Sequence, residues 1–370
     1  SHKFEKIISV DNLLLAWQEF ICGKRNKPDI QIFARNLMDN ILTLHEDLAN
    51  KTYVHGGYES FYVNDPKRRH IHKASVRDRL VHHAVYRILY PFFDRIFIGD
   101  SYSCRLEKGT HKAINRFRAL ACQVSKNHTR SCWVLKCDIK KFFASIDHAV
   151  LFKILENHIP DEDILWLLQN IIGSFETDIE YPPLVKGRRG GVNYLRLNPL
   201  SLLHPALARI ASDEGEKIGL PLGNLTSQLF ANIYMNVFDA WVKHRLRVET
   251  YGDASLPYIR YADDFIFLSR DRAYLGSIIP TIRDFLDTRL RLTLHPNKIS
   301  LKTLASGVDF LGWVNFSDHR VLRNKTGRRM SARIKESPTE NTLQSYLGML
   351  KHGNGHKTSQ KIREECWLWR

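Results

Sequence analysis

The chain has 370 residues, of which 55 are basic and 39 acidic, so its formal net charge is +16. This excess favours a polyanionic partner, most simply nucleic acid. The sequence has no CxxC pair, no secretory signal and no apolar stretch long enough to cross a membrane. We therefore expect no zinc site, no membrane partner and a cytoplasmic location.

The N-terminal part of the chain predicts helices and one hairpin. Residues 11–50 carry apolar side chains at helical spacing, and a second amphipathic helix is expected over residues 76–93. Between them, residues 58–74 (YESFYVNDPKRRHIHKA) alternate in polarity like a β-hairpin, with Asp65-Pro66 at its turn.

The rest of the chain alternates strands with helices. The expected elements begin with a strand segment (132–147) that leads into a helix from about His148. They continue with a Gly/Pro turn and a strong helix (219–242), two strands (256–269), a helix (272–289), the start of a hairpin (310–314) and a basic, mostly helical tail from Arg328. This alternation predicts an α+β fold with one main antiparallel sheet.

Two adjacent carboxylates stand inside one of the apolar stretches. Asp263 and Asp264 belong to YADDF (261–265), and like charges side by side repel, so the pair is either a surface turn or a cation site. A third acid, Asp138, follows the apolar strand CWVL. Divalent cations that serve phosphate chemistry take oxygen ligands, usually from separate segments. The three acids together would hold two Mg²⁺ ions for an in-line displacement.

The motifs occur in an order that resembles reverse transcriptases, from about Arg69 to Trp313. The resemblance implies a right-hand polymerase fold with fingers, an antiparallel-sheet palm and a short helical thumb. The expected domains are an N-terminal helical region (1–55), fingers (56–130), a palm (131–314, with an insertion at about 175–217) and a basic helical thumb (315–370).

The resemblance assigns the catalytic residues. CDIKKFFASID supplies Asp138 and YADD supplies Asp263 and Asp264, as ligands of two Mg²⁺ ions for which Mn²⁺ is a possible substitute. Ile139 is the expected neighbouring contributor to the metal shell. HPNKIS supplies Lys298, the residue expected to protonate the pyrophosphate.

The nucleotide pocket follows from the same resemblance. Arg69 is the candidate for the incoming triphosphate, with Lys67 beside it, although Lys67 is equally compatible with a solvated basic hairpin. Phe143 falls where the family keeps a bulky ring that excludes a 2′-hydroxyl. In GLPLGNLTSQ, Gly223 shapes the pocket, and Gln228 is either a template contact or an ordinary polar helix residue.

A further set of residues is expected to hold primer and template. Tyr261 either lies near the primer end or packs under the hairpin. The others are Lys108 and His111 in DSYSCRLEKGTHKAI (100–114), and the primer-gripping turn FLGW with Phe310, Leu311 and Gly312.

Three polar residues near these motifs carry a structural interpretation. His82 and His83 lie on a predicted helix with no acid or Cys at ligand spacing, so we expect them to be structural or RNA-facing. Asp147 is expected to cap the helix that begins at the next residue rather than to act in catalysis.

The turn motif also suggests a subclass. Leu222-Gly223 with Ser227-Gln228 resembles the enzymes of diversity-generating retroelements, which copy a template RNA into mutagenised cDNA with a small accessory protein. The alternative is an antiphage defence reverse transcriptase that makes DNA from a non-coding RNA. The implied partners are the template or non-coding RNA, dNTPs, the cDNA product and an accessory protein or a second copy of the chain.

Two other classes remain as alternatives to a reverse transcriptase. A catalytically silent RNA-binding scaffold would be expected to have lost some of the key residues, yet all three acids, Arg69 and Lys298 are present. An RNA-dependent RNA polymerase is disfavoured by Phe143, because a small residue there would admit a ribose 2′-hydroxyl.

Overall fold

The computed structural model describes residues 3–64, 68–177, 217–248 and 254–368. They divide into two compact units, which we describe one at a time. The first unit comprises Ser1–Arg95 and Lys141–Tyr234, and the second comprises Ile96–Lys140 and Met235–Arg370. The expected turn at Asp65-Pro66, the residue Lys67 and nearly all of the expected 175–217 insertion lie outside the described residues.

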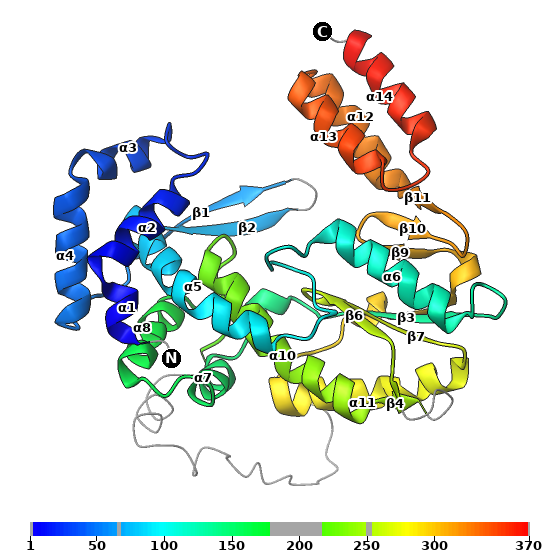
Figure 1. The fold of residues 1–370 in the computed structure, drawn as a ribbon, viewed down its shortest axis with the longest axis horizontal. Coiled ribbons are helices and arrows are strands. Elements are labelled where there is room, and N and C mark those ends of the chain that lie inside the picture. Colours follow the sequence, from blue (N-terminus) through cyan, green and yellow to red (C-terminus); the bar gives the residue numbers. More distant parts are fainter. Residues whose placement is uncertain (1–2, 65–67, 178–216, 249–253, 369–370) are drawn as a thin grey trace, which may run out of the picture. The chain divides into compact units, whose positions relative to one another are not determined.

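The first unit is mainly helical and carries one hairpin (Figure 1). Side-chain caps explain several helix starts: Ser9, Asp147 and Asp161 each accept a hydrogen bond from a backbone N–H of the following turn. Its elements are α1 (Phe4–Ile8), α2 (Val10–Phe20), α3 (Pro28–Arg35), α4 (Leu37–Ala49), β1 (Tyr58–Val63), β2 (Arg69–Ala74), α5 (Val76–Ile96), η1 (Phe142–Ser145), α7 (His148–Glu156), α8 (Glu162–Gly173) and the first part of α10 (Leu225–Arg245).

The hairpin of the first unit confirms the alternation seen in the sequence. Strands β1 and β2 pair antiparallel, from Tyr58 opposite Ala74 to Val63 opposite Arg69. The expected helix over 76–93 is also present, although α5 continues to Ile96 through Pro91. The N-cap expected at Asp147 is confirmed, since its Oδ1 accepts from the Val150 backbone N–H at 2.8 Å.

The second unit is built on the main antiparallel sheet that the sequence predicts. Its strand order is β6-β7-β3-β8. The strands are β3 (Trp133–Asp138), β6 (Tyr258–Tyr261), β7 (Asp264–Ser269) and β8 (Ser300–Thr303), flanked by helices α6 (Thr110–Val124) and α11 (Arg272–Leu290) and accompanied by the small β4–β5 pair (Arg247–Val248 and Ala254–Ser255).

Helices cover both faces of this sheet, as Figure 1 shows for α6 and α11. On the α6 face, Ile266 and Leu268 of β7 pack with Phe117 and Leu120. On the other face, Phe265 of β7 packs on Phe238 of α10, with ring centroids 5.1 Å apart. Burial on both faces explains why β7 reads as a continuous apolar run rather than an alternating one.

A second small sheet leads to the C-terminal helices. Its strands are β9 (Val308–Phe310), β10 (Trp313–Asn315) and β11 (Arg320–Leu322). The expected FLGW turn is confirmed, and Leu311 and Gly312 both have positive φ (50° and 89°), as a two-residue type I′ hairpin turn requires.

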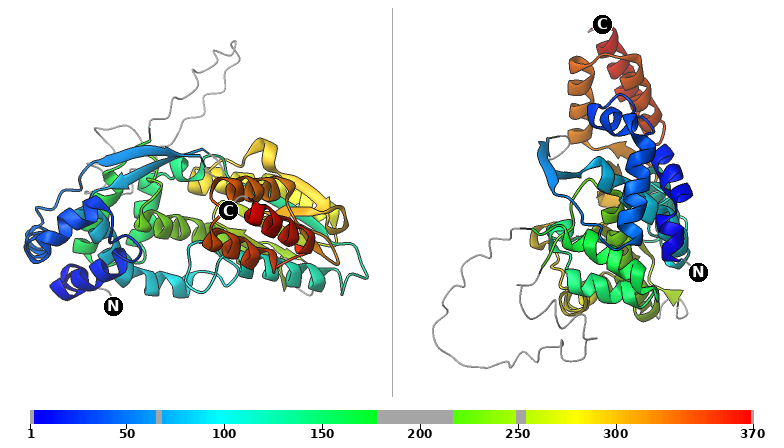
Figure 2. Two further views of the ribbon diagram at one scale, coloured as in Figure 1. Left: turned by 90° about the horizontal axis from the view of Figure 1, so that it is seen from above. Right: turned by 90° about the vertical axis from the view of Figure 1, so that its left-hand side faces the viewer.

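The tail is helical, as predicted, and starts four residues earlier than expected. Helices α12 (Asn324–Glu336), α13 (Glu340–Leu350) and α14 (His356–Leu368) pack side by side in every view (Figure 1 and Figure 2). Their shared core includes Met330, Ile334 and Ile362. Among the described helices, none combines the length and apolarity needed to cross a membrane.

Candidate active site

The three predicted acids come together on adjacent strands of the second unit. Asp138 is the last residue of β3, and Asp264 is the first residue of β7. The two residues are direct partners across the antiparallel ladder. Asp263 precedes Asp264 in the β6–β7 turn. The fold therefore brings Asp138, which lies 125 positions before Asp263 in the chain, beside these two acids. The sequence-based grouping of these carboxylates is thus reproduced by the register of the sheet.

A buried arginine holds the turn that carries Asp263. Arg260 is fully buried and donates from Nε and Nη2 to the two carboxylate oxygens of Asp239, at 2.8 and 2.7 Å. Its remaining nitrogen, Nη1, donates to the backbone carbonyl of Ala262 at 3.0 Å. Ala262 has φ of +56°, a left-handed conformation that costs an alanine roughly 1–3 kcal/mol. The guanidinium therefore fixes a strained residue directly before Asp263.

Further hydrogen bonds complete this buried pair. The Tyr258 hydroxyl donates to Asp239 Oδ1 at 2.7 Å, and Arg260 Nη2 also donates to Ser101 Oγ at 3.0 Å. The pair was not predicted from the sequence. The available signal was a charge inside each of two apolar stretches, Arg260 in LPYIRY and Asp239 in VFDAWV, because buried charges need partners.

Burial and mutual repulsion raise the pKa values of the turn acids. Burial, followed by the charges of Asp138 and Asp264, raises the pKa of Asp263 to about 6. Burial is also the main cause of the raised pKa of Asp264. Ionisation of the two turn acids is therefore disfavoured in the folded protein, and a cation beside them would favour it.

Two lysines lie against these acids. Lys298 Nζ lies 2.6 Å from Asp138 Oδ1, so the residue predicted to protonate pyrophosphate is in contact with a predicted metal ligand. Lys136 Nζ lies 3.4 Å from Asp264 Oδ1 and donates to the Asp309 carbonyl at 3.2 Å. Both lysines line a cavity of about 250 Å³ beside Asp138 and Asp264.

Lys136 was not predicted from the sequence, although its position carried a signal. Side chains alternate across a strand, so a residue two positions before Asp138 lies on the same face of β3. Lys136 is that residue, and its ammonium lowers the pKa of Asp264, against the effect of burial. Lys136 thus acts as a counter-ion to Asp264 within the unit.

The donor set fits magnesium. Within the described ranges, no three Asp, Glu, His or Cys side chains are already gathered in a metal-binding cluster, and Lys298 and Lys136 contact two of the acids instead. Mg²⁺ is commonly bound by one or two carboxylates together with substrate phosphates and water, so a fully formed protein cage is not required. The unneutralised charge at Asp263 favours a cation. Ile139 is buried, and its role in the metal shell stays a prediction.

In the first unit, the predicted steric gate is tied to the Gly/Pro turn. Phe143 lies in η1, half-buried, with its ring edge-on to Phe142 at a centroid distance of 5.4 Å. Its carbonyl accepts from the Leu220 N–H at 2.7 Å, and the Ile146 carbonyl accepts from the Gly219 N–H at 2.8 Å. These bonds join the backbone of η1 to the GLPLGNLTSQ segment, and the role of Phe143 as a steric gate stays a prediction.

The same turn is bonded to strand β2. The His72 N–H donates to the Leu222 carbonyl at 2.8 Å, and Asn224 Nδ2 donates to the His72 carbonyl at 3.0 Å. Gly223 has φ of +119°, and a Cβ added there would meet Ile71 Cγ2 at 3.0 Å. A glycine is thus required by both conformation and close approach.

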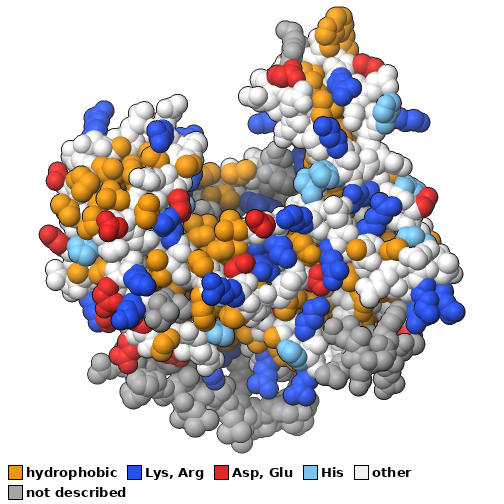
Figure 3. Space-filling view, in the orientation of Figure 1, with side chains coloured by type: hydrophobic (Ala, Val, Ile, Leu, Met, Phe, Trp, Pro, Cys, Tyr) orange, Lys and Arg blue, Asp and Glu red, His pale blue; other side chains and the backbone are white. Residues whose placement is uncertain are grey.

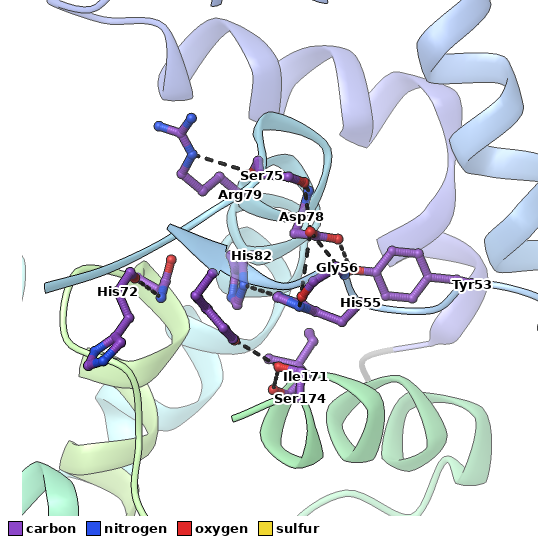
Figure 4. Close-up of polar contacts among 12 residues, drawn as sticks. Tyr53, His55, Gly56, His72, Ser75, Asp78, Arg79, His82, Ile171 and Ser174 are labelled. Atoms are coloured by element: carbon purple, nitrogen blue, oxygen red, sulfur yellow. Dashed lines mark hydrogen bonds and ion pairs between the residues drawn. The ribbon is translucent and has the colours of Figure 1, made fainter. Parts of the chain in front are cut away.

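A buried polar chain supports the helix that follows this turn, and Figure 4 shows its His55–His82 contact. His55 Nδ1 lies 2.6 Å from the Gly56 carbonyl and must donate to it, so a neutral His55 accepts at Nε2. His82 Nε2, 3.0 Å away, then donates, and His82 Nδ1 accepts from the Thr226 hydroxyl on α10. Burial lowers the pKa of His82, which favours the neutral imidazole that this sequence of donors and acceptors requires. His82 is therefore a buried structural residue rather than an RNA-facing one.

An aspartate anchors the other end of this chain in Figure 4. Asp78 is buried and accepts from the Tyr53 hydroxyl at 2.8 Å, the Ser75 hydroxyl at 2.6 Å and the Gly56 N–H at 3.2 Å. The network joins the 53–57 loop, α5 and the start of α10. Its long-range partners gave no local signal in the sequence.

The other predicted nucleotide-binding residues are less constrained. Arg69 is exposed at the first position of β2, next to the undescribed residues 65–67. Gln228 is half-buried in the first turn of α10. Both positions are compatible with ligand contact as well as with a solvated hairpin residue or an ordinary polar helix residue, so both roles stay predictions.

The predicted primer and template residues all lie in the second unit, and several have internal partners. The Tyr261 hydroxyl lies 3.2 Å from Thr110 Oγ1, and its ring packs against the α6 face of the sheet. Lys108 Nζ donates to the Gly99 carbonyl at 2.8 Å, and His111 stacks on His352 at 3.8 Å. In the primer-grip turn, Phe310 is fully buried, whereas Leu311 and Gly312 are half-buried at the tip.

Comparison with known proteins places this site in a family. The family model described as "Reverse transcriptase (RNA-dependent DNA polymerase)" matches residues 64–314. Protein YkfC of Escherichia coli (strain K12) is 24% identical over 305 residues, covering 75% of this chain and 70% of YkfC. The group II intron-encoded protein LtrA of Lactococcus lactis subsp. cremoris is 22% identical over 345 residues, covering 84% of this chain. The chain spans 54% of the length of LtrA.

Two solved telomerase structures are also similar. Telomerase from Candida albicans, in complex with a TWJ fragment of telomeric RNA, matches at a TM-score of 0.43 and 12% identity, covering 84% of this chain and 55% of that one. Telomerase from Candida tropicalis, with the same kind of fragment, matches at 0.49 and 10%, covering 88% and 56%.

The matched segment includes the acids of the β3 and β6–β7 strand ends and the turn motif before α10. It runs over more than half of the chain, and the mixed helix-and-sheet architecture is that of a right-hand polymerase. The chain belongs to the reverse transcriptase (RNA-dependent DNA polymerase) family of nucleotidyltransferases.

Proposed function

We propose that this protein is an active RNA-directed DNA polymerase that makes cDNA from an associated template or non-coding RNA. The observation that carries the proposal is the register of β3 and β7, which sets Asp138 opposite Asp264 and next to the turn acid Asp263. A silent scaffold would have no need to keep three repelling carboxylates at one strand end, because such a cluster costs stability.

The acids would bind two Mg²⁺ ions. When bound, these ions supply the charge that lowers the pKa of the primer 3′-hydroxyl and stabilises the departing pyrophosphate. Asp138, Asp263 and Asp264 hold that charge in place. Lys298 contacts Asp138 in this structure, and with a cation bound at that carboxylate its ammonium would be available to donate a proton to the departing pyrophosphate.

The first unit contributes the proposed nucleotide contacts. Arg69 neutralises the incoming triphosphate through its planar fork of donors. Phe143 excludes a 2′-hydroxyl by bulk and so selects deoxynucleotides. Gly223 shapes the pocket through its positive φ and its close contact with Ile71, which set the course of the turn before α10.

A diversity-generating retroelement is the proposed biological setting, and antiphage defence is the alternative. Support for the first comes from the turn motif, with Leu222-Gly223 and Ser227-Gln228. An accessory protein or a second copy of the chain belongs to the same proposal. Exposed apolar side chains on α3 and α4 favour such a partner, among them Ile32 (67% exposed), and Figure 3 shows apolar side chains gathered over these helices.

The proposal is tested by purifying the protein from cells that carry its native locus and sequencing the nucleic acid bound to it. Variants Asp263→Asn and Asp264→Asn are the controls. We expect cDNA with the wild type alone; changes at template adenines assign diversification, whereas repeats or copies of a flanking non-coding RNA assign defence. The same RNA with all three proteins, and no DNA with any, would replace the polymerase by the scaffold.

A further inference from the structure

An open groove of about 1110 Å³ lies at the end of the main sheet in the second unit. Its lining comes from the loop after α6 (Thr129–Ser131), the junction between β7 and α11 (Ser269–Ala273 with Gly276) and Leu301 of β8. None of these residues belongs to the candidate active site.

The groove lies at the opposite end of the strands from the catalytic acids. It borders the Trp133–Ser269 pair, five residue steps along the β3–β7 ladder from the Asp138–Asp264 pair. At about 3.3 Å per residue, this is a separation of roughly 17 Å. A ligand in the groove is therefore not the reacting nucleotide.

The lining is strongly basic. Of the residues that the structure describes, it contains the three arginines Arg130, Arg270 and Arg272, against a single carboxylate, Asp271. That carboxylate is engaged, since its Oδ1 accepts from the Ala273 and Tyr274 backbone N–H groups at 2.8 and 3.1 Å as the cap of α11. In the space-filling view, Lys and Arg side chains gather at the right-hand edge of the face drawn, where the loop after α6 lies (Figure 3).

Two features hold these charges in place. Arg272 lies over the Trp133 ring, with its guanidinium carbon 5.3 Å from the ring centroid. The loop before Arg130 has three successive left-handed residues, Lys126, Asn127 and His128, with φ of 50°, 55° and 64°. This conformation costs an ordinary residue roughly 1–2 kcal/mol and an Asn less, so other contacts must hold the loop in it.

Hydrogen bonds hold the loop in this conformation. The Asn127 N–H donates to the Cys122 carbonyl and the Arg130 N–H donates to the Ser125 carbonyl, both at 2.9 Å. Thr129 Oγ1 donates to the Lys126 carbonyl at 2.7 Å. The loop thus presents Arg130 from a preorganised backbone.

We propose that this groove binds the phosphate backbone of a base-paired part of the protein's RNA, outside the template–primer segment that is being copied. Arginine forks match phosphate oxygens, and three of them along an open groove suit a repeating polyanion better than one small anion. Among the described residues, the lining contains no aromatic side chain, and Arg272 covers the nearby Trp133 ring. Unpaired bases therefore have no ring on which to stack, which favours backbone contact with helical RNA.

This inference rests on the proposed function for its choice of RNA, so the test separates the two. The groove variant is Arg130→Gln with Arg272→Gln. The matched control is Arg283→Gln with Arg289→Gln, which removes the same charge from exposed positions further along α11. Both proteins are compared with wild type by thermal melting before use.

The first measurement is the affinity for a labelled RNA hairpin with a stem of about 20 base pairs, over a range of salt concentrations. We expect the groove variant to bind roughly tenfold more weakly, with a salt slope smaller by about 2 because two phosphate contacts are lost. The control is expected to change the affinity by less than about threefold. Equal losses in both variants, or a loss only for unpaired RNA, would overturn the inference.

The second measurement is extension of a short primer on a template too short to reach the groove. Extension at the wild-type rate by both variants is expected. A groove variant that binds the hairpin normally but extends slowly refutes the inference. If no protein extends the primer while hairpin binding still depends on the groove, the proposed polymerase function fails and the groove assignment stands.

Discussion

Replacing Arg260 tests whether the buried ion pair positions the catalytic turn or only stabilises the fold. Arg260→Leu would leave the Asp239 carboxylate buried and without its bidentate partner, although Tyr258 still donates to it. Removing one member of a buried pair costs about 3–5 kcal/mol. That loss is a large part of the stability of an ordinary domain, so a single leucine variant is expected to melt far below wild type.

The double variant Arg260→Leu with Asp239→Leu separates stability from positioning. Replacing both charges by apolar groups is often neutral for stability, so the double variant is expected to recover most of the melting temperature. It still lacks the donor to the Ala262 carbonyl. A hydrogen bond from a charged donor is worth about 1.5–3 kcal/mol, and each 1.4 kcal/mol is a factor of ten in rate. We therefore expect kcat to fall roughly ten- to a hundredfold.

Steady-state primer extension with dNTPs in excess is the assay, with the melting temperature measured on the same samples. Arg260→Lys is a third variant, which keeps the charge for Asp239 and loses the fork. It is expected to fold and to lose activity like the double variant. A double variant that recovers both stability and full kcat would refute the positioning role of Arg260.

Four further outcomes follow from the two units. Asp263→Asn should raise the unfolding free energy of the metal-free protein by about 3 kcal/mol at pH 7.5, because the wild-type pKa is raised to about 6 and its ionised form is disfavoured on folding. The gain should vanish below about pH 4, and equal melting curves at pH 7.5 would contradict the prediction. Phe143→Ala should raise incorporation of ribonucleotides relative to deoxynucleotides by at least about tenfold in single-nucleotide extension, and no change would remove the steric gate. Gly223→Ala should lower the unfolding free energy, measured by chemical denaturation, by about 1–2 kcal/mol, because position 223 has a positive φ and the added Cβ would meet Ile71. An unchanged denaturation midpoint would contradict this prediction. Burial lowers the pKa of His83 to about 4, so between pH 6.5 and 4 the unfolded chain takes up a proton that the folded chain excludes, and the unfolding free energy should fall over this range. His83→Gln should flatten the slope of the unfolding free energy against pH, and an unaltered slope would point to other groups.

The parts of the fold that could be predicted are those encoded locally. The hairpin turn at Leu311 and Gly312 and the cap at Asp147 each depend on a few neighbouring residues. The acids could be grouped because an apolar strand end and a strand–turn–strand pattern are both visible in the sequence. Their convergence then required only that these strands pair, which the register confirms.

The parts that could not be predicted depend on partners far apart in the chain. Asp239 and Arg260 are separated by a helix end, a small strand pair and a loop, and only the packing of α10 on the sheet brings them together. The His55–His82 contact likewise joins a loop to a helix. A sequence shows that such groups need partners when buried, but not which partners the tertiary structure supplies.

The measurement that tests the central claim most directly is primer extension on a defined RNA template with Mg²⁺ and dNTPs, comparing wild type with Asp263→Asn. The account predicts template-dependent DNA synthesis by the wild type and a loss of several orders of magnitude in the variant, which otherwise folds and binds the same RNA. Equal activity in both proteins would show that the acids of the β6–β7 turn are not the catalytic centre. No synthesis by a folded wild type on its own RNA would contradict the polymerase assignment itself.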